Sequence, residues 1–272
     1  MNSLITRTVS ALVALVILAG SFYLWQTAGL KVLILVVVLI GTWELTEVLF
    51  KDTRHVLNKV IFFLFSLLIF LLSSAKPAFS GLIYSFFLAC FCVASLSLNK
   101  KFHDLSQLAA YQAKGALGFF YMGLLPGLIL ALLDLPRGFF WFLSLLGVVF
   151  AGDIGAYLVG ILWGKKKILP SISPKKTLEG SLGGLCFSVL TGLLLSFFFS
   201  HISTVAFVGL SFVTGIFAQF GDFFESLLKR VADVKDSGTL MPGHGGVLDR
   251  IDGVLFASPV FLLGAILLEN LL

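Results

Sequence analysis

The chain has 272 residues, of which 58% are hydrophobic and only 12% are charged. An ordinary soluble domain has about 25% charged residues, so this composition excludes a soluble globular protein. A membrane-spanning helix needs about 20 apolar residues, and the chain is long enough for several of them. We therefore expect a single membrane domain over residues 1–272 rather than a soluble domain with one anchor.

Long apolar runs separated by short polar breaks recur along the chain. Because only helices satisfy their own backbone hydrogen bonds in lipid, we predict an all-α polytopic membrane protein with about nine transmembrane helices. The helices within residues 1–135 carry no motif, so we expect the catalytic helices and cytoplasmic loops in residues 136–272. The expected helices span residues 8–27, 30–50, 60–75, 81–98, 115–134, 138–163, 181–200, 203–228 and 254–271.

The positive charges are distributed unevenly across these predicted crossings. With nine crossings, all of the 19 Lys and Arg residues except Lys31, Lys76 and Arg137 fall on one side of the membrane. The positive-inside rule makes this side cytoplasmic, so we expect a cytoplasmic N-terminus and a C-terminus on the far side. We expect the protein in the plasma (inner) membrane of a bacterium, with its functional site facing the cytoplasm.

Acidic and basic side chains are concentrated in residues 221–253. The first part of this segment belongs to an expected helix, where residues three, four and seven positions apart lie on one face. The polar residues that share this face are Asp222, Glu225, Ser226 and Lys229.

Asp249 and Asp252 would also share a face if their segment is helical. Beside the glycine-rich turn at residues 242–246, such carboxylates favour a site for a hard cation. Magnesium binds a few carboxylate oxygens and leaves positions for water and substrate phosphates. Simpler interpretations stay open: Glu225 and Lys229 form an i,i+4 ion pair, Asp252 caps the last helix, and the glycines only make a turn.

A second basic segment, residues 165–180, precedes the next expected helix. Ser173 followed by Pro174 is typical of a helix N-cap and first helical position. A helix N-terminus offers free amide groups and the positive end of the helix dipole, which suit a phosphate. A basic loop attracted to anionic lipid headgroups explains the same composition. The candidate phosphate-binding residues are Ser173, Lys175, Lys176 and Thr177.

Asp153 lies inside an apolar run between small residues. A carboxylate there is costly and needs a partner or a polar cavity, so it is either a structural hydrogen-bond acceptor or part of a site. Glu44 and Glu47 follow Trp43 near the end of an apolar run. At this position their side chains either extend toward water at the membrane interface or have a functional role.

At these residues the chain closely resembles the phosphatidate cytidylyltransferase family, also called CDP-diglyceride synthase. Its signature reads Ser-x-x-Lys-Arg at residues 226–230, Lys-Asp-x-Gly at 235–238, and Pro-Gly-His-Gly-Gly-x-x-Asp-Arg-x-Asp at 242–252. The segments at residues 173–180 and 153–157 also match this family.

The resemblance implies a nucleotidyltransferase of phospholipid biosynthesis that converts CTP and phosphatidic acid into CDP-diacylglycerol and pyrophosphate. It implies Mg²⁺, alone or with a second cation, held by Asp222, Asp249 and Asp252. Membrane lipids are further partners, a homodimer is compatible with the sequence, and no nucleic acid is expected.

Besides the metal ligands, the expected site residues fall into three groups. The catalytic group is Asp222, Asp249, Lys229, Arg230 and Arg250. The substrate-binding group is Ser173, Lys175, Lys176, Thr177, Gly243, His244, Gly245 and Gly246. The second-choice group, which would shape the pocket or surround the metal, is Asp153 and Glu225.

Two other function classes stay open. One is a CTP-dependent enzyme that acts on another lipid, either a polyprenol or phytol kinase or a synthase of CDP-activated ether lipids. The other is an ion-coupled transporter, which would place carboxylates near the midplane and often repeats its halves, whereas no repeat is visible here.

Overall fold

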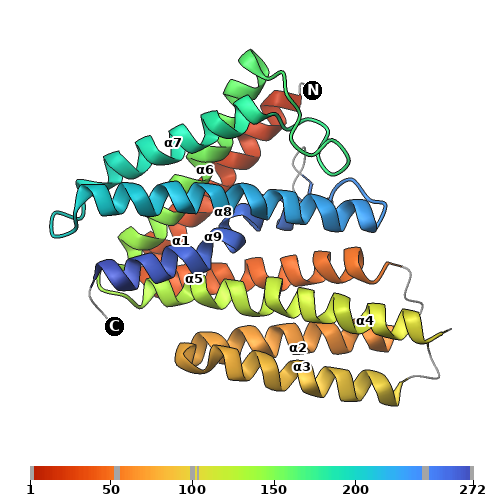
Figure 1. Cartoon of the computed structure of the whole chain (residues 1–272). Helices are drawn as coiled ribbons and strands as arrows, with labels where there is room; N and C mark the ends of the chain where they lie inside the picture. Colours follow the sequence, from red (N-terminus) through yellow and green to blue (C-terminus); the bar gives the residue numbers. More distant parts are fainter. Residues whose placement is uncertain (1–2, 52–55, 99–101, 103, 241–244, 270–272) are drawn as a thin grey trace. The chain divides into compact units, whose positions relative to one another are not determined.

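The computed structural model describes residues 3–51, 56–98, 102, 104–240 and 245–269, with side chains described from residue 12 onward. Eight helices within these residues are long and apolar enough to cross a membrane, which confirms an all-α polytopic membrane fold. The elements, shown in Figure 1, are α1 (Ser3–Leu49), α2 (Val56–Ala75), η1 (Pro77–Phe79), α3 (Ser80–Ser97), α4 (Leu105–Gly118), η3 (Phe119–Leu124), α5 (Leu125–Leu133), α6 (Gly138–Trp163), α7 (Leu178–Ser196), α8 (Thr204–Val231) and α9 (Leu248–Leu268).

The first two expected helices, residues 8–27 and 30–50, both lie in α1. Gln26 interrupts this helix with φ 53° and ψ −134°, a left-handed conformation that a residue with a side chain rarely adopts. Just after the break, a side chain at Gly29 would overlap the carbonyl of Ser21, so the chain needs glycine there. The number of crossings and their orientation stay predictions.

Several helices begin earlier than the hydropathy predicts. The expected helix 115–134 starts at residue 105, because the side chain of Asp104 accepts a hydrogen bond from the amide of Gln107 (2.8 Å) and caps α4. Leu108 and Tyr111 are buried, so this polar-looking segment contributes to the packed bundle. The expected short helix 60–75 likewise starts at Val56 and has 20 residues.

The chain folds into two compact units. The first unit comprises Met1–Leu130 and Val231–Arg250, and the second comprises Ala131–Arg230 and Ile251–Leu272. The boundary near residue 130 lies close to the expected division at 135, but residues 231–250 belong to the first unit. A single membrane domain stays a prediction.

The first unit has an aromatic core formed by α2, α3 and η3. The Phe62 and Phe119 rings stack with their centroids 5.2 Å apart, and the Phe91 ring meets Phe119 edge-on at 4.8 Å. All three side chains are fully buried. Aromatic pairs at these separations are attractive beyond the area they bury, so the three rings fix this part of the bundle.

In the second unit, α6 and α7 pack closely along their length (Figure 1). Small residues permit this approach: a side chain at Gly155 would overlap Phe187, and a side chain at Gly183 would overlap Val159. Helices in lipid associate through such close packing because lipid chains are as apolar as the helix surfaces. The α6–α7 pair therefore forms a rigid support for the segment that connects the two helices.

We expect Gly183→Ala to lower the stability of the protein by about 1–3 kcal/mol, because the added methyl group overpacks the contact with Val159. The measurement is thermal unfolding of detergent-purified protein. The matched control is Gly209→Ala on α8, where an added methyl group meets no atom within 4 Å. Equal melting temperatures for the two variants would contradict the close α6–α7 contact.

Candidate active site

The end of α8 in the second unit carries an ion pair beside an aromatic ring. Lys176, just before α7, places its Nζ 2.5 Å from Oδ2 of Asp222 and 4.1 Å from the ring centroid of Phe223. A cation over an aromatic face is stabilised by the ring's quadrupole. The Lys176 and Asp222 side chains remain partly exposed, so the pair can meet a ligand.

The segment that carries Lys176 folds back on itself through backbone hydrogen bonds. The carboxylate of Glu179 accepts hydrogen bonds from the amides of Lys165 (2.9 Å) and Lys166 (3.1 Å). An isolated antiparallel bridge joins Lys167 to Thr177. These contacts close the loop between α6 and α7 and fix the position of Lys176.

The predicted N-cap at Ser173 and Pro174 is wrong. Helix α7 begins at Leu178, and the hydroxyl of Thr177 caps it by accepting a hydrogen bond from the amide of Gly180 (3.2 Å). Ser173 lies in a preceding turn, where its carbonyl accepts a hydrogen bond from the amide of Lys176 (3.4 Å). Ser173 and Thr177 both suit a helix cap. The contacts of Glu179 with the loop place the cap at Thr177, four residues after Ser173.

The predicted phosphate-binding residues of this segment differ in accessibility. Lys175 is exposed, and its carbonyl accepts a hydrogen bond from Nζ of Lys167 (3.3 Å). Thr177 is buried and its hydroxyl serves the helix cap, while Ser173 is half-buried. Lys176 and Lys175 are therefore the residues of this group that present charge to a ligand most directly.

Asp252 interacts with two other carboxylates of the second unit. The charges of Asp222 and of Asp153, on α6, both act on Asp252 in α9, and Lys176 opposes them. A side chain at Gly221 would overlap the carbonyl of Asp252, so glycine lets α8 and α9 approach closely here. Asp252 on α9 thus interacts with acidic side chains of α6 and α8 and with Lys176.

This grouping has the donor chemistry for magnesium. Among the residues that the structure describes, no three His, Cys, Asp or Glu side chains form a metal site by themselves. Magnesium, however, usually takes only one or two carboxylates and completes its coordination with water and substrate phosphates. Asp222 and Asp252 fit such a partly protein-bound ion, while its presence stays a prediction.

The basic residues at the end of α8 are held by contacts within the second unit. Lys229 forms an ion pair with the buried Glu225, which agrees with the simple i,i+4 interpretation of these two residues. Arg230 is exposed and donates from Nε to the carbonyl of Ile172 (3.2 Å), so it joins α8 to the loop before α7. Ser226 donates to Oδ1 of Asp222 (3.4 Å).

Asp249 lies in the first unit, where it organises the glycine-rich segment. Its Oδ2 accepts hydrogen bonds from the amide (3.0 Å) and hydroxyl (2.9 Å) of Ser237 and from the amide of Gly246 (2.7 Å). Gly245 has φ 84°, and a side chain there would approach Oδ2 of Asp249 to 2.5 Å. The turn therefore wraps a carboxylate, and the role of Asp249 as a metal ligand stays a prediction.

Gly243 and His244 belong to the turn and were expected to bind substrate, but they lie outside the described residues. The Gly246 amide, which we expected near phosphate, donates to Asp249 here. Arg250 is exposed at the start of α9, where it can meet a charged ligand.

Sequence reasoning missed the role of Glu44 on α1. This carboxylate is 6% exposed and accepts hydrogen bonds from the amides of Val247 (3.1 Å) and Leu248 (2.8 Å). The hydroxyl of Ser237 lies 3.4 Å from Oε2 of Glu44. Glu44 thus caps α9 from another helix, which is why α9 begins at residue 248 rather than at the expected 254 and why Asp252 is not its cap.

The glycines of this segment fit around the same carboxylate. A side chain at Gly238 or at Gly246 would overlap Glu44. The signal available in the sequence was an acidic residue within an apolar run, but its partners lie about 200 positions away. Only the folded chain brings them together.

The sequence model of the cytidylyltransferase family matches residues 5–267. The chain belongs to the cytidylyltransferase family. This match covers nearly the whole chain and confirms the resemblance on which the expected chemistry rests.

Curated relatives named phosphatidate cytidylyltransferase are also similar to the chain. The protein from Haemophilus influenzae is 44% identical over 137 residues, which cover 47% of this chain and 46% of the relative. The protein from Staphylococcus aureus is 42% identical over 124 residues, which cover 45% of this chain and 47% of the relative. The chain therefore spans about half the length of the curated relatives it matches.

We expect Glu44→Gln to lower stability, because the amide weakens the charge-assisted contacts with two backbone N–H groups and brings its own buried donor. The expected loss is about 1–3 kcal/mol in the free energy of unfolding. Thermal unfolding in detergent is the measurement. The control is Glu47→Gln, also on α1, whose side chain is 45% exposed and pairs with Lys59. A surface pair contributes little, so this control should change stability by less than about 1 kcal/mol.

Proposed function

We propose that the chain transfers a cytidylyl group from CTP to phosphatidate, giving CDP-diacylglycerol and pyrophosphate. The family match across residues 5–267 carries this proposal, together with relatives named for this reaction. The grouping of Asp222, Asp252 and Lys176 in the second unit supports it, since phosphoryl transfer needs charge control around the reacting phosphates.

In this reaction an oxygen of the phosphatidate phosphate attacks the α-phosphorus of CTP. A new phosphorus–oxygen bond forms, and the bond from the α-phosphorus to the oxygen that bridges to the β-phosphate breaks. Pyrophosphate leaves with that electron pair. The attacking oxygen is already ionised near neutral pH, so the chain needs to position and neutralise charge rather than to remove a proton.

The proposed roles follow from the contacts of the second unit. Lys176 forms an ion pair with Asp222, and when CTP binds its ammonium group would also interact with the triphosphate. Arg230, which is exposed and anchored to Ile172, would neutralise a phosphate at the end of α8. Magnesium held by Asp222 and Asp252 would stabilise charge on the phosphate oxygens and on the leaving group.

We propose that the protein lies in the plasma membrane of a bacterium with this site on the cytoplasmic side. The uneven distribution of Lys and Arg supports this orientation, and cytoplasmic CTP requires it. A homodimer and further membrane lipids stay compatible with this proposal.

Pyrophosphate release by detergent-purified protein tests the reaction. Release should require CTP, phosphatidate and Mg²⁺ together, and CDP-diacylglycerol should form in equal amount. We expect Asp222→Asn to lower kcat/KM by about 100-fold or more, because it removes a charge that positions cations at the reacting phosphates. Product detection by mass spectrometry identifies the lipid that is formed.

The control is Asp233→Asn, which removes the same charge from an exposed turn beyond α8. Asparagine tolerates the left-handed backbone of this position (φ 49°), so activity should change less than about twofold. If the protein converts another lipid alcohol or lipid phosphate and not phosphatidate, then that lipid is the acceptor and the proposed acceptor is wrong. Full activity of Asp222→Asn would place the reacting phosphates elsewhere.

A further inference from the structure

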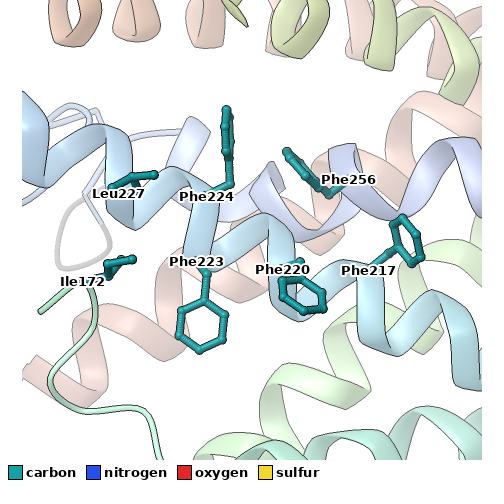
Figure 2. Close-up of a pocket in the computed structure, with 7 residues that line it drawn as sticks. All are labelled: Ile172, Phe217, Phe220, Phe223, Phe224, Leu227 and Phe256. Carbon is teal, nitrogen blue, oxygen red and sulfur yellow. The ribbon is translucent and has the colours of Figure 1, made fainter. Parts of the chain in front are cut away.

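An apolar groove lies along α8 in the second unit, and one of its lining residues, Phe223, contacts Lys176 of the Lys176–Asp222 pair. Aromatic rings from α8 and α9 form most of its walls (Figure 2), and its volume of about 340 Å³ is that of a small-ligand site. The groove is lined by Ile172, Phe217, Phe220, Phe223, Phe224, Leu227 and Phe256. We refer to it as the aromatic groove.

The shape of the aromatic groove follows from helix periodicity and ring packing. Phe217, Phe220, Phe224 and Leu227 are three or four positions apart on α8, so they form one stripe along the helix. The Phe224 ring contacts the Phe256 ring of α9 with their centroids 4.9 Å apart. This contact holds the Phe224 and Phe256 rings against each other, so α8 and α9 both contribute to the groove wall.

One end of the groove is bordered by positive charge. Phe223 lines the groove, and the same ring carries Nζ of Lys176 at 4.1 Å. Ile172 also lines the groove, and its carbonyl accepts the hydrogen bond from Arg230. Two cations thus contact residues that line the groove. Lys176, in the loop before α7, contacts Phe223, and Arg230, near the end of α8, contacts Ile172.

A ligand that matches this arrangement has an apolar chain and an anionic head. We infer that the aromatic groove holds one acyl chain of the phospholipid substrate, with the lipid phosphate beside Arg230 and next to the triphosphate that Lys176 contacts. This inference rests on the proposed function and specifies which part of the second unit selects the lipid. Other exposed apolar residues of α8, such as Phe212, lie outside the set that lines the groove.

The experiment measures chain-length selectivity. The kcat/KM for dioleoyl phosphatidate in mixed micelles, at fixed surface concentration, is divided by that for dihexanoyl phosphatidate. This ratio does not depend on the fraction of folded enzyme, so partial instability of a variant does not distort it. We expect Phe220→Ala and Phe256→Ala each to lower the ratio about 10-fold, the discrimination that a single apolar contact usually provides.

The matched control is Phe212→Ala, which removes an exposed ring from the same helix outside the groove. Phe212 is 45% exposed and Phe220 is 59% exposed, so both substitutions remove a comparable surface ring. The ratio for Phe212→Ala should stay within about twofold of the wild-type ratio, because this ring lies outside the lining set. Equal ratios for Phe212→Ala and Phe220→Ala would overturn the acyl-chain assignment.

Two further outcomes also decide the inference. If the groove substitutions change the oligomeric state measured by light scattering but leave the ratio unchanged, the groove is a contact between copies of the chain. A phosphatidate with a photoreactive diazirine near the end of its acyl chain should label peptides of α8 or α9 in the wild-type protein. Labelling there by a protein that makes no CDP-diacylglycerol would uphold the groove and overturn the proposed reaction, while labelling only elsewhere would overturn the groove.

Discussion

A carboxylate inside an apolar helix bundle must find hydrogen-bond donors or a cation, and the polar parts of this protein are arranged around that requirement. Removing an ionised group from water costs several kcal/mol unless partners replace the lost hydration. Glu44 finds its donors at the start of α9, in the amides of Val247 and Leu248. A helix N-terminus leaves such amides without partners, so one contact satisfies a buried acid and a helix end together.

This contact gives a structural reason for the composition of the glycine-rich segment. Gly238 and Gly246 leave the space that the Glu44 carboxylate occupies, and Gly245 adopts a backbone conformation that brings the turn around Asp249. Glycine-rich turns in nucleotide-binding proteins are often explained by close approach of a phosphate. In the first unit the same residues are required by two carboxylates of the protein itself, so glycine here need not indicate a phosphate contact.

The sequence predicts features that depend on neighbouring residues better than features that depend on distant ones. Apolar runs predict the helices because their length and composition suffice, and the spacing of Glu225 and Lys229 predicts their ion pair. Helix starts are harder: Ser173 and Thr177 both suit an N-cap, and the choice depends on how Glu179 contacts the preceding loop. The pairing of Lys176 with Asp222 joins segments 46 positions apart, and no local pattern encodes it.

The proposed joining of a water-soluble nucleotide to a lipid would place two opposite demands on one helix. Charged groups must meet the phosphates, whereas the lipid's acyl chains require an apolar surface that continues from the same point. Helix α8 meets both demands because adjacent residues point in different directions: Asp222 faces Lys176, while Phe220 and Phe224 line the aromatic groove. Phe223 lies at the junction, since its ring contacts the lysine and also lines the groove. The geometry of a single helix can thus hold the polar and apolar halves of an amphipathic substrate in a fixed relation, so that binding the chain also positions the phosphate.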